Sequence, residues 1–494
     1  MITDDFSALI LQNFPHLPTK EQADVVADWA SFILSRRNDE AFLLRGFAGT
    51  GKTSLVGALV KTLSELRQPV ELLAPTGRAA KVFSLYAGRP AYTIHRRIYR
   101  QKSITEMDNF QANVNLHRNT LFIVDEASMI ANDGLSGAMF GTGRLLDDLI
   151  QFVYSAEGCR LLLIGDTAQL PPVGEYLSQA LEANALAGYG LNVHEATLTQ
   201  VVRQTEDSGI LWNATALRER ISIEDVFELP RIRVSCFPDI KVIAGNELIE
   251  ALEQSYYRCG KEETIVITRS NKRANIYNNG IRARILDCEE ALSNGDQILI
   301  VKNNYYFKLD VEDEDDHAHN GQSQREDRRK ENDSFIANGD IAVVRRVRNE
   351  REFYGLHFAD VVVTFPDYND AELDAVVIMD TLQSDAPALT KQQQEQLFQG
   401  VWDDYPELTN KRDRMKRLRE DPYYNALQIK HAYAVTCHKA QGGQWEHVYI
   451  DQGYMTDEML GPDYFRWLYT AITRATDTVF LVNWPETQID ASFG

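Results

Sequence analysis

The sequence has no run of apolar residues close to the roughly 18 that a membrane-spanning helix needs. Its first residues are acidic rather than basic, which is not typical of a signal peptide. Cysteine is scarce, with five residues in 494 positions and no Cys-x-x-Cys pair. This scarcity argues against a disulfide framework and against a zinc or iron–sulfur site. We therefore expect a cytoplasmic protein that keeps its thiols reduced and has no membrane partner.

Basic residues are fewer than acidic ones: the chain has 51 Lys and Arg against 72 Asp and Glu, which gives a formal net charge of −21. Such a charge makes nucleic-acid binding less expected without excluding it. Bulk charge governs solubility and steering, whereas phosphate binding needs only a local basic groove. Hydrophobic residues make up 44% and charged residues 25%, a balance typical of globular chains. The length suggests about three domains.

Short apolar runs alternate with longer helical patterns between residues 41 and 164. Continuous apolarity is typical of strands that are buried on both faces of a parallel sheet. The runs are Ala41–Leu44, Val70–Leu73, Leu121–Val124 and Leu161–Ile164, and the pattern returns at Thr264–Ile267, His447–Ile450 and Thr478–Val482. The sequence therefore predicts the α/β class, with two sheets in two stacked domains and an insertion in the second.

The insertion lies between about residues 292 and 430 and contains two charged segments. Residues 310–333 hold ten acidic and four basic residues, which predicts a solvated loop. His317 and His319 in that loop could suggest a metal site. A flexible solvated loop is the preferred interpretation, because no neighbouring residues would fix the geometry of metal ligands. Residues 411–419 hold six basic residues in nine, on a helix that we expect to begin near Thr390. These basic residues could form either a solvated helix face or a face that contacts phosphates, and both interpretations are kept.

Residues 46–53 read GFAGTGKT and match the P-loop pattern G-x-x-x-x-G-K-[ST]. The motif follows an apolar run and opens a helical pattern, which is its confirming context. Backbone N–H groups of such a loop cradle phosphate oxygens at a helix N-terminus. We expect Lys52 to reach the β- and γ-phosphates of ATP and Thr53 to bind Mg²⁺. The other expected ATP-binding residues of this segment are Gly46, Gly49, Thr50, Gly51 and Ser54.

Two further apolar runs end in polar residues that suit ATP hydrolysis. Leu121–Val124 is followed by Asp125 and Glu126. Asp125 can hold the Mg²⁺ shell, and Glu126 can orient and deprotonate the attacking water. The run Leu161–Ile164 leads into GDTAQLPPVG at 165–174, where Gln169 is placed to sense the γ-phosphate or the water.

This series of motifs resembles superfamily 1 helicases, and within them the RecD-like and Dda-type group that moves 5′ to 3′ on DNA. By resemblance, Gln22 reads adenine, while Arg203 and Arg474 act at the γ-phosphate from across the cleft. The run YAVTCHKAQG at 433–442 resembles the late motif that joins DNA to ATP, so Gln441 and Gly442 are expected near ATP. The residues expected to contact DNA are Thr76, Gly77, Arg78, His95, Thr436, His438 and Lys439.

The resemblance also implies a domain plan of two RecA-like motors and a small SH3-like barrel. Residues 1–195 would form the first motor domain (1A), with a strand-splitting pin (1B) at 96–118. Residues 196–290 and 431–494 would form the second motor domain (2A), and residues 291–430 the inserted barrel domain (2B), with the acidic loop at 310–333. The stretches 294–306 and 336–341 resemble the barrel. That loop and the helical segment near 390–420 depart from the family.

The expected activity is ATP- and Mg²⁺-dependent unwinding of DNA, with single strands and single-strand/duplex junctions as partners. We expect a monomer with possible protein partners in repair or recombination. A translocase that remodels protein–DNA complexes without unwinding remains an alternative. A small-molecule kinase or GTPase would explain the P-loop but neither the second sheet nor the two arginines. A non-catalytic scaffold would not need both the intact P-loop and its two following carboxylates.

Overall fold

The computed structural model describes residues 2–35, 37–101, 110–132, 134, 141–202, 208–223, 228–309, 334–456 and 459–490. The acidic segment 310–333, which includes His317 and His319, lies outside the described residues, and so does Arg203. The expectations for these residues stay predictions.

The first sheet has six parallel strands in the order β3-β2-β6-β7-β1-β8. Its strands are β1 (Glu40–Gly46), β2 (Val70–Ala74), β3 (Ala91–Thr93), β6 (Leu121–Val124), β7 (Arg160–Gly165) and β8 (Asn192–Leu198). Its helices are α1 (Ile2–Asn13), α2 (Lys20–Leu34), α3 (Lys52–Glu65), α4 (Gly77–Ala87), α5 (Ile94–Ile98), α6 (Leu145–Tyr154) and α7 (Ala183–Ala187). All four predicted apolar runs are strands of this sheet.

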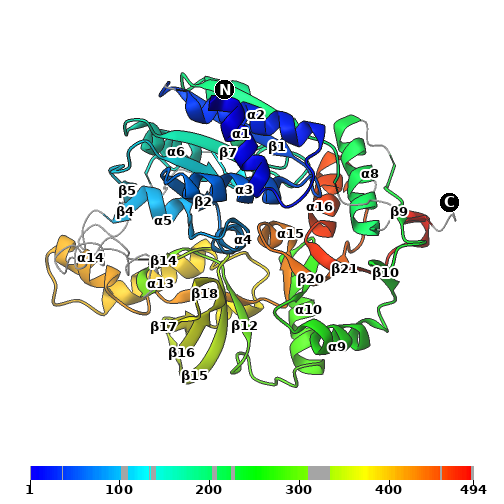
Figure 1. Ribbon diagram of the computed structural model, residues 1–494. Helices are drawn as coiled ribbons and strands as arrows, with labels where there is room; N and C mark the ends of the chain where they lie inside the picture. Colours follow the sequence, from blue (N-terminus) through cyan, green and yellow to red (C-terminus); the bar gives the residue numbers. More distant parts are fainter. Residues whose placement is uncertain are drawn as a thin grey trace.

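Helices cover both faces of the first sheet, which explains why its inner strands β1, β6 and β7 are mostly apolar and buried. Phe42 and Leu44 of β1 pack on one face against α1, α2 and α3. Ala41 and Leu43 point to the opposite face, into a core shared with α5 and α6. Alternate side chains of a strand face opposite ways, so a strand between two helical layers has no polar side. In Figure 1 this layer occupies the upper part of the molecule.

The second sheet has five parallel strands in the order β10-β21-β20-β11-β19. Its strands are β10 (Ile240–Ile243), β11 (Thr264–Thr268), β19 (Ala434–Thr436), β20 (Trp445–Asp451) and β21 (Ala475–Val482). Around it lie α8 (Gly209–Ile223), α9 (Leu248–Cys259), α10 (Asn271–Arg284), α15 (Cys437–Ala440) and α16 (Pro462–Ile472), with the short pair β9 (Ile232–Arg233) and β22 (Ile489–Asp490) nearby. The prediction of a second parallel sheet, and hence of the α/β class, is confirmed.

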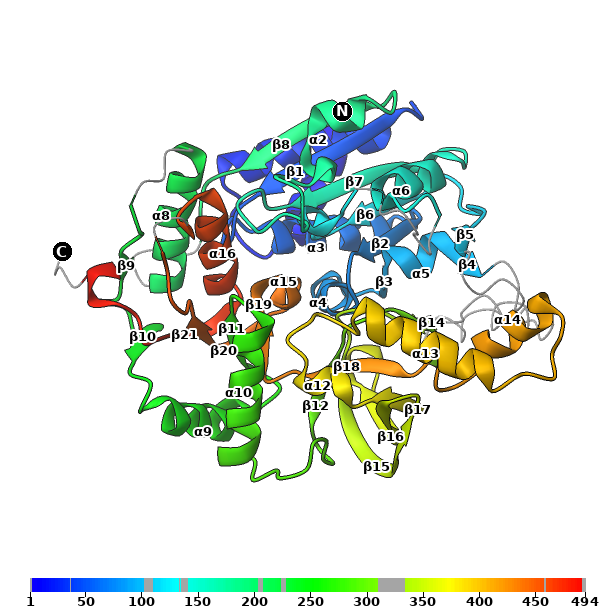
Figure 2. The ribbon, with the colours of Figure 1, turned by 180° about the vertical axis from the view of Figure 1, so that it is seen from behind.

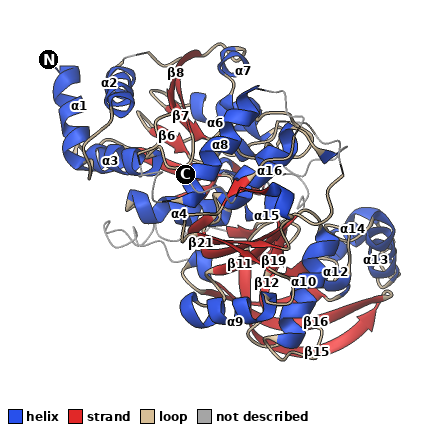
Figure 3. Ribbon diagram, turned by 90° about the vertical axis from the view of Figure 1, so that its right-hand side faces the viewer, coloured by secondary structure: helices blue, strands red, loops and turns tan. Residues whose placement is uncertain are grey.

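A closed five-stranded barrel is inserted between α10 and β19. Its strands are β12 (Gln297–Ile300), β15 (Ile341–Phe353), β16 (Leu356–Phe365), β17 (Ala371–Ile378) and β18 (Leu427–His431), and the hairpin of β13 (Asn304–Leu309) and β14 (Ser334–Ile336) accompanies it. Figures 2 and 3 show the barrel and the second sheet on the same side of the first sheet, with α4 between the layers in Figure 2. The expectation of a small barrel insertion is confirmed, while the exact domain boundaries stay a prediction.

The helical segment of the insertion is two helices, α13 (Lys391–Asp403) and α14 (Lys411–Arg419), and not one. The expectation that the basic run continues a helix begun near Thr390 is therefore wrong in part. Thr390 does cap α13, accepting from the backbone N–H of Gln393. Pro406 follows the end of α13, and proline supplies no N–H for a helical bond. Asn410 then caps α14 anew.

The expected pin segment forms a two-stranded antiparallel ribbon of β4 (Tyr99–Gln101) and β5 (Phe110–Ala112). Residues 102–109 between these strands lie outside the described part of the chain. The ribbon follows α5, whose His95 was expected to touch DNA. Figures 1 and 2 place it at the edge of the first layer, away from α8 and α16.

Candidate nucleotide and DNA site

The P-loop joins the end of β1 to the start of α3, at the carboxyl edge of the first sheet. Gly49 and Gly51 have φ values of 77° and 81°, a region that side chains with a Cβ rarely adopt. The ammonium of Lys52 donates to the carbonyls of Gly46 and Phe47 at 2.6 and 2.9 Å. A Cβ on Gly46 would lie 2.9 Å from the Lys52 side chain. The glycines thus let Lys52 fold back into the curve of the loop.

Gln22 lies against this loop from α2 and is almost fully buried. Its Nε2 donates to the carbonyl of Thr50 at 3.0 Å, and its Oε1 accepts from the backbone N–H of Thr19 at 3.0 Å. The side chain therefore completes a capping box on α2 and touches the P-loop at once. The structure brings Gln22 to the nucleotide loop, and its role in reading adenine stays a prediction.

Asp125 and Glu126 follow β6, next to β2 and β7 in the sheet. Asp125 accepts a hydrogen bond from the hydroxyl of Tyr86, a residue of α4 that sequence reasoning did not single out. Its other oxygen accepts from the backbone N–H of Glu126 at 2.8 Å. Burial raises the pKa of Glu126, and the nearby Arg474 opposes that rise. A carboxylate with a raised pKa is suited to accept a proton from water.

Arg474 comes from the second sheet and reaches the first across the cleft. Its Nη1 lies 3.8 Å from Glu126 Oε1, and only 4% of the residue is exposed. The same guanidinium donates to the carbonyls of Thr470 and Gly443, at 3.2 and 3.3 Å. These bonds fix its direction from within the second domain. The placement agrees with an arginine that acts across the cleft, although its contact with phosphate stays a prediction.

Gln169 lies on the loop after β7 and is buried, with 7% of its surface exposed. Its Oε1 is a buried oxygen without a protein partner among the described residues. The neighbouring Leu170 is tied to the second domain by both backbone groups. Its N–H donates to Thr470 at 2.9 Å, and its carbonyl accepts from Gln441 at 2.6 Å. A free acceptor on a fixed loop suits a residue that senses phosphate or water.

Helix α16 presents one face to the ATP loops of the first domain. Sequence reasoning singled out Arg474, in the turn after this helix, but missed the contacts of the helix itself. Arg466 donates to the carbonyl of Thr167, and Tyr469 contacts both the P-loop and Asp166. Arg466, Tyr469 and Thr470 follow the i, i+3, i+4 spacing of one helical face. Polar residues at that spacing in an otherwise apolar helix were the available signal.

The residues expected to contact DNA at α4 are partly engaged by other parts of the protein. Thr76 caps α4, accepting from the backbone N–H of Ala79 at 3.3 Å. The Arg78 guanidinium lies 4.5 Å from the ring centre of Trp445 and donates to the carbonyl of Gln444 at 3.0 Å. Arg78 therefore joins the two motor sheets. Gly77 is buried under the barrel.

Gly442 packs directly against the start of α4. It has a φ of 74°, and a Cβ there would lie 2.9 Å from the Cβ of Ala79 and 3.1 Å from the hydroxyl of Thr76. Only glycine allows this approach. The late motif is thus close to the expected DNA motif at Thr76, while Gln441 reaches the loop of Gln169. The segment spans the distance between the two expected sites.

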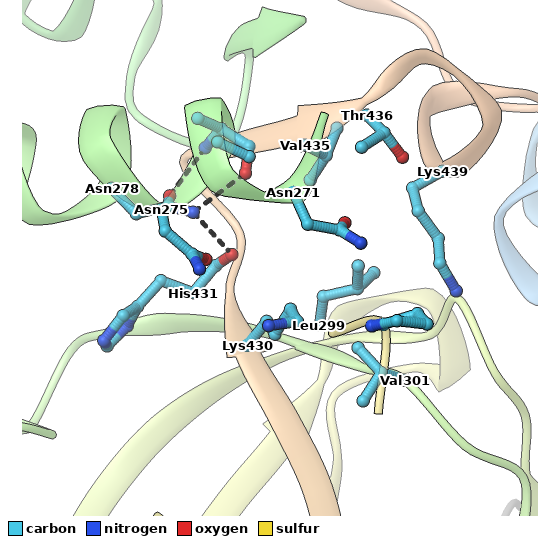
Figure 4. Close-up of a pocket in the computed structure, with 13 residues that line it drawn as sticks. Asn271, Asn275, Asn278, Leu299, Val301, Lys430, His431, Val435, Thr436 and Lys439 are labelled. Carbon is cyan, nitrogen blue, oxygen red and sulfur yellow. Dashed lines mark hydrogen bonds between the residues drawn. The ribbon is translucent and has the colours of Figure 1, made fainter. Parts of the chain in front are cut away.

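Thr436 and Lys439 line a small cavity between α10, β12 and the ends of β18 and β19 (Figure 4). Burial and, to a smaller extent, the charge of Lys430 together lower the pKa of Lys439 to about 8. His438 of the same helix is exposed. His95 is half-buried on α5, and burial lowers its pKa to about 4, so its imidazole is neutral at pH 7. The structure does not bring His95 into this cavity.

The donors at the P-loop edge fit ATP with Mg²⁺. A hydroxyl and a carboxylate, from Thr53 and Asp125, are oxygen ligands of the kind that Mg²⁺ prefers alongside phosphates and water. Thr53 and Ser54 line an open groove next to Tyr86, whose hydroxyl holds Asp125. The close fit of Lys52 beside Gly46 leaves a cradle that a Cβ would fill. These observations support ATP and Mg²⁺ as ligands.

Comparison with known families gives two matches in the expected order. An AAA domain model matches residues 19–226, and a UvrD-like helicase C-terminal domain model matches residues 431–482. The first contains the P-loop, Asp125, Glu126 and Gln169, and the second contains the late motif and Arg474. The first match covers all strands of the first sheet, and the second match covers β19, β20 and β21 of the second sheet, beyond the inserted barrel.

Three related proteins illustrate the likeness. An ATP-dependent RecD2 DNA helicase of Deinococcus radiodurans is 31% identical over 202 residues, which is 41% of this chain and 25% of that protein. This chain thus spans about a quarter of that relative. An uncharacterised protein of Acanthamoeba polyphaga mimivirus is 21% identical over 93% of this chain and 98% of its own length. A solved Pif1 helicase from Bacteroides, in complex with ADP-AlF3 and single-stranded DNA, shows 14% identity and a TM-score of 0.46 over 97% of this chain and 95% of its own.

The two family matches and the RecD2 relative bear out the resemblance to superfamily 1 helicases of the RecD-like group that the motifs predicted. The chain combines two parallel sheets, and the P-loop edge of the first sheet faces residues of the second domain.

Proposed function

We propose that this chain is an ATP-dependent DNA helicase that moves 5′ to 3′ along single-stranded DNA and unwinds adjoining duplex. The observation that carries the proposal is the buried approach of Arg474 to Glu126, at 3.8 Å between residues of different sheets. A kinase or GTPase of one domain has no such second sheet. An arginine that completes the site only when two domains meet makes ATP turnover depend on their closure.

The residues of the chain divide the work of hydrolysis. Lys52 and the P-loop amides hold the phosphates, and the Gln169 side-chain oxygen, which has no partner among the described residues, is available to accept from the attacking water. Glu126 takes the proton of the attacking water, while Arg474 stabilises the charge that develops on the transferred phosphoryl group. Mg²⁺, when bound at Thr53 and Asp125, neutralises phosphate charge. Loss of the γ-phosphate weakens closure, and the two sheets separate.

The expected nucleotide site and the expected DNA site are connected by direct contacts, so closure of the two domains affects both. Gln441 holds the loop of Gln169, and the adjacent Gly442 packs on the start of α4 beside Thr76. A shift of one domain against the other therefore moves both the phosphate-sensing loop and the expected strand-binding motif. Sequence-tolerant binding of a single strand would follow from phosphate contacts and base stacking.

The direction of movement rests on the RecD-like resemblance and on the size of the first-domain insertion. Superfamily 1 relatives of opposite polarity usually carry large helical insertions in both motor domains. Here the segment between His95 and Leu121 is about 25 residues, too short for a domain of typical size. Its described part contains the end of α5 and the ribbon β4–β5. Both features favour 5′-to-3′ movement at a single-strand/duplex junction.

Strand displacement on two matched duplexes tests the proposal. One duplex has a 5′ single-stranded tail and the other a 3′ tail of equal length and sequence. We expect unwinding of the 5′-tailed duplex, little of the 3′-tailed one, and none with Lys52→Ala. Preference for the 3′ tail would refute the direction alone. DNA-stimulated ATPase without unwinding of either duplex would favour a translocase that remodels protein–DNA complexes, and ATPase indifferent to DNA would refute the motor.

A further inference from the structure

The hydroxyl of Tyr469 makes two hydrogen bonds that cross from the second domain to the first. It accepts from the backbone N–H of Ala48 in the P-loop at 2.8 Å. It donates to Oδ2 of Asp166, at the end of β7, at 2.6 Å. A hydroxyl has one proton to donate and lone pairs to accept with, so both bonds are made by the same atom without conflict. One atom of α16 thus touches two ATP loops of the other domain.

Both hydrogen bonds of the Tyr469 hydroxyl are buried, so their loss is not compensated by water. Tyr469 is 1% exposed and Asp166 is 2% exposed, so water does not replace the hydroxyl while the cleft is closed. The second oxygen of Asp166 is already used by the backbone N–H of Ala168 at 2.9 Å. Without the hydroxyl, the closed cleft would contain an unpaired carboxylate oxygen and an unpaired P-loop amide. In an open cleft, water would satisfy both groups.

We propose that Tyr469 is a positioning residue that couples closure of the two motor domains to the P-loop. The proposal rests on the proposed motor function. Tyr469 does not need to touch nucleotide for this role, because it acts through the Ala48 amide and the Asp166 carboxylate. It stabilises the closed arrangement in which Arg474, in the turn that follows α16, reaches Glu126.

Tyr469→Phe tests the hydroxyl while it keeps the ring in place. A hydrogen bond to a charged group, once lost in a buried site, shifts an equilibrium by about 10- to 100-fold. We therefore expect kcat in saturating single-stranded DNA to fall by about 10- to 100-fold, with a much smaller change in KM for ATP. The ratio of DNA-stimulated to unstimulated ATPase should fall with it. A change confined to KM would overturn the proposal.

Tyr464→Phe is the matched control on the same helix. Tyr464 is 2% exposed, and its hydroxyl donates to Oε1 of Gln452 at 2.5 Å, within the second domain. This variant also loses a buried hydrogen bond of a tyrosine hydroxyl, here to a neutral amide, without touching the contact between the domains. We expect DNA stimulation within about twofold of the unmodified protein. Equal loss of stimulation in both variants would show a general disturbance of α16 and overturn the proposal.

Two further measurements separate this role from plain structural support. Hydrogen exchange of the peptide that contains Ala48 should be faster in Tyr469→Phe and unchanged in Tyr464→Phe. In a double-mutant cycle with Asp166→Ala, the loss of turnover in the double variant should be smaller than the sum of the two single losses, since both variants remove the shared bond. Additive losses, or unchanged exchange at Ala48, would overturn the proposal. If the unmodified protein were not stimulated by DNA, the motor function would fail, and the exchange at Ala48 would still decide the contact.

Discussion

Gly77→Ala should loosen the barrel from the first motor domain. Gly77 begins α4, and a Cβ there would lie 2.5 Å from the hydroxyl of Tyr368 and 2.6 Å from Oδ1 of Asp340. Both partners belong to the barrel, and they are bonded to each other, since the Tyr368 hydroxyl donates toward the two Asp340 oxygens at 3.1 Å. Neither can swing aside without breaking that bond. The barrel must therefore move.

The expected loss of contact free energy combines two effects, the steric crowding by the new Cβ and the higher helix propensity of alanine. Overpacking of this kind costs about 1–3 kcal/mol, and alanine in place of glycine in a helix returns about 0.5–1 kcal/mol. The net loss at the contact is about 1–2 kcal/mol, which corresponds to about 5- to 30-fold in a local opening equilibrium. The ion pair of Lys81 and Asp367 at 3.3 Å lies beside the contact and should weaken with it.

Hydrogen exchange measures this opening without requiring the whole chain to unfold in one step. Peptides that cover 337–340 and 366–368 should exchange about 5- to 30-fold faster in Gly77→Ala, in line with that opening equilibrium. Gly280→Ala is the control, because it lies in α10 and a Cβ there meets nothing within 4 Å. It should leave the same peptides unchanged. Equal exchange in Gly77→Ala and the unmodified protein would mean that the barrel does not rest on α4 as described.

Three further predictions concern the nucleotide site and the barrel contact. Lys52→Ala should abolish ATP turnover while single-strand binding, measured by fluorescence anisotropy, stays largely intact; normal ATPase would refute the P-loop assignment. Glu126→Gln should bind ATP but hydrolyse it very slowly, because an amide does not take the proton of water, and single-turnover kinetics would reveal a wrong role if bound ATP turned over normally. Burial raises the pKa of Asp340 to about 7, so its protonated form is favoured in the fold. The barrel contact should accordingly be tightest near pH 4 and weaken as pH rises through about 7. Asp340→Asn should remove that dependence. Exchange at 337–340 must be corrected for the intrinsic rise of amide exchange with pH, and protection that still fell between pH 4 and pH 7 in Asp340→Asn would contradict this cause.

Local patterns predicted the sheets and the P-loop well, because the physics that shapes them is local. A strand buried on both faces consists mainly of apolar residues. The run Leu121–Val124 has this pattern, and it forms the buried strand β6. The P-loop needs glycine at positions of positive φ, and Gly49 and Gly51 occupy them. The break between α13 and α14 is equally local, since Pro406 and Asn410 mark it. The prediction of one helix rested on the basic run at 411–419, and charge alone does not indicate where a helix begins.

Contacts between distant segments were not predictable in the same way. Tyr469 meets Ala48 across more than 400 positions, and no periodicity links the two. Arg78 was expected on DNA because its motif contacts a strand in relatives, yet its guanidinium stacks on Trp445. Tyr86 lies at the far end of α4 from its motif and still reaches Asp125. Each of these depends on how domains pack, which only the folded arrangement reveals.

The order of strands in the second sheet has a consequence for synthesis of the chain. β10 and β11 are made early, yet they are not neighbours, because β21 and β20 lie between them. Val266 of β11 pairs with Ala434 and Tyr449, both beyond the inserted barrel. At about 5–20 residues per second, a ribosome needs roughly ten to thirty seconds to cross that insertion. During this interval two apolar strands have no partner in their own sheet, so the nascent second domain is the part of the chain that most needs protection by chaperones.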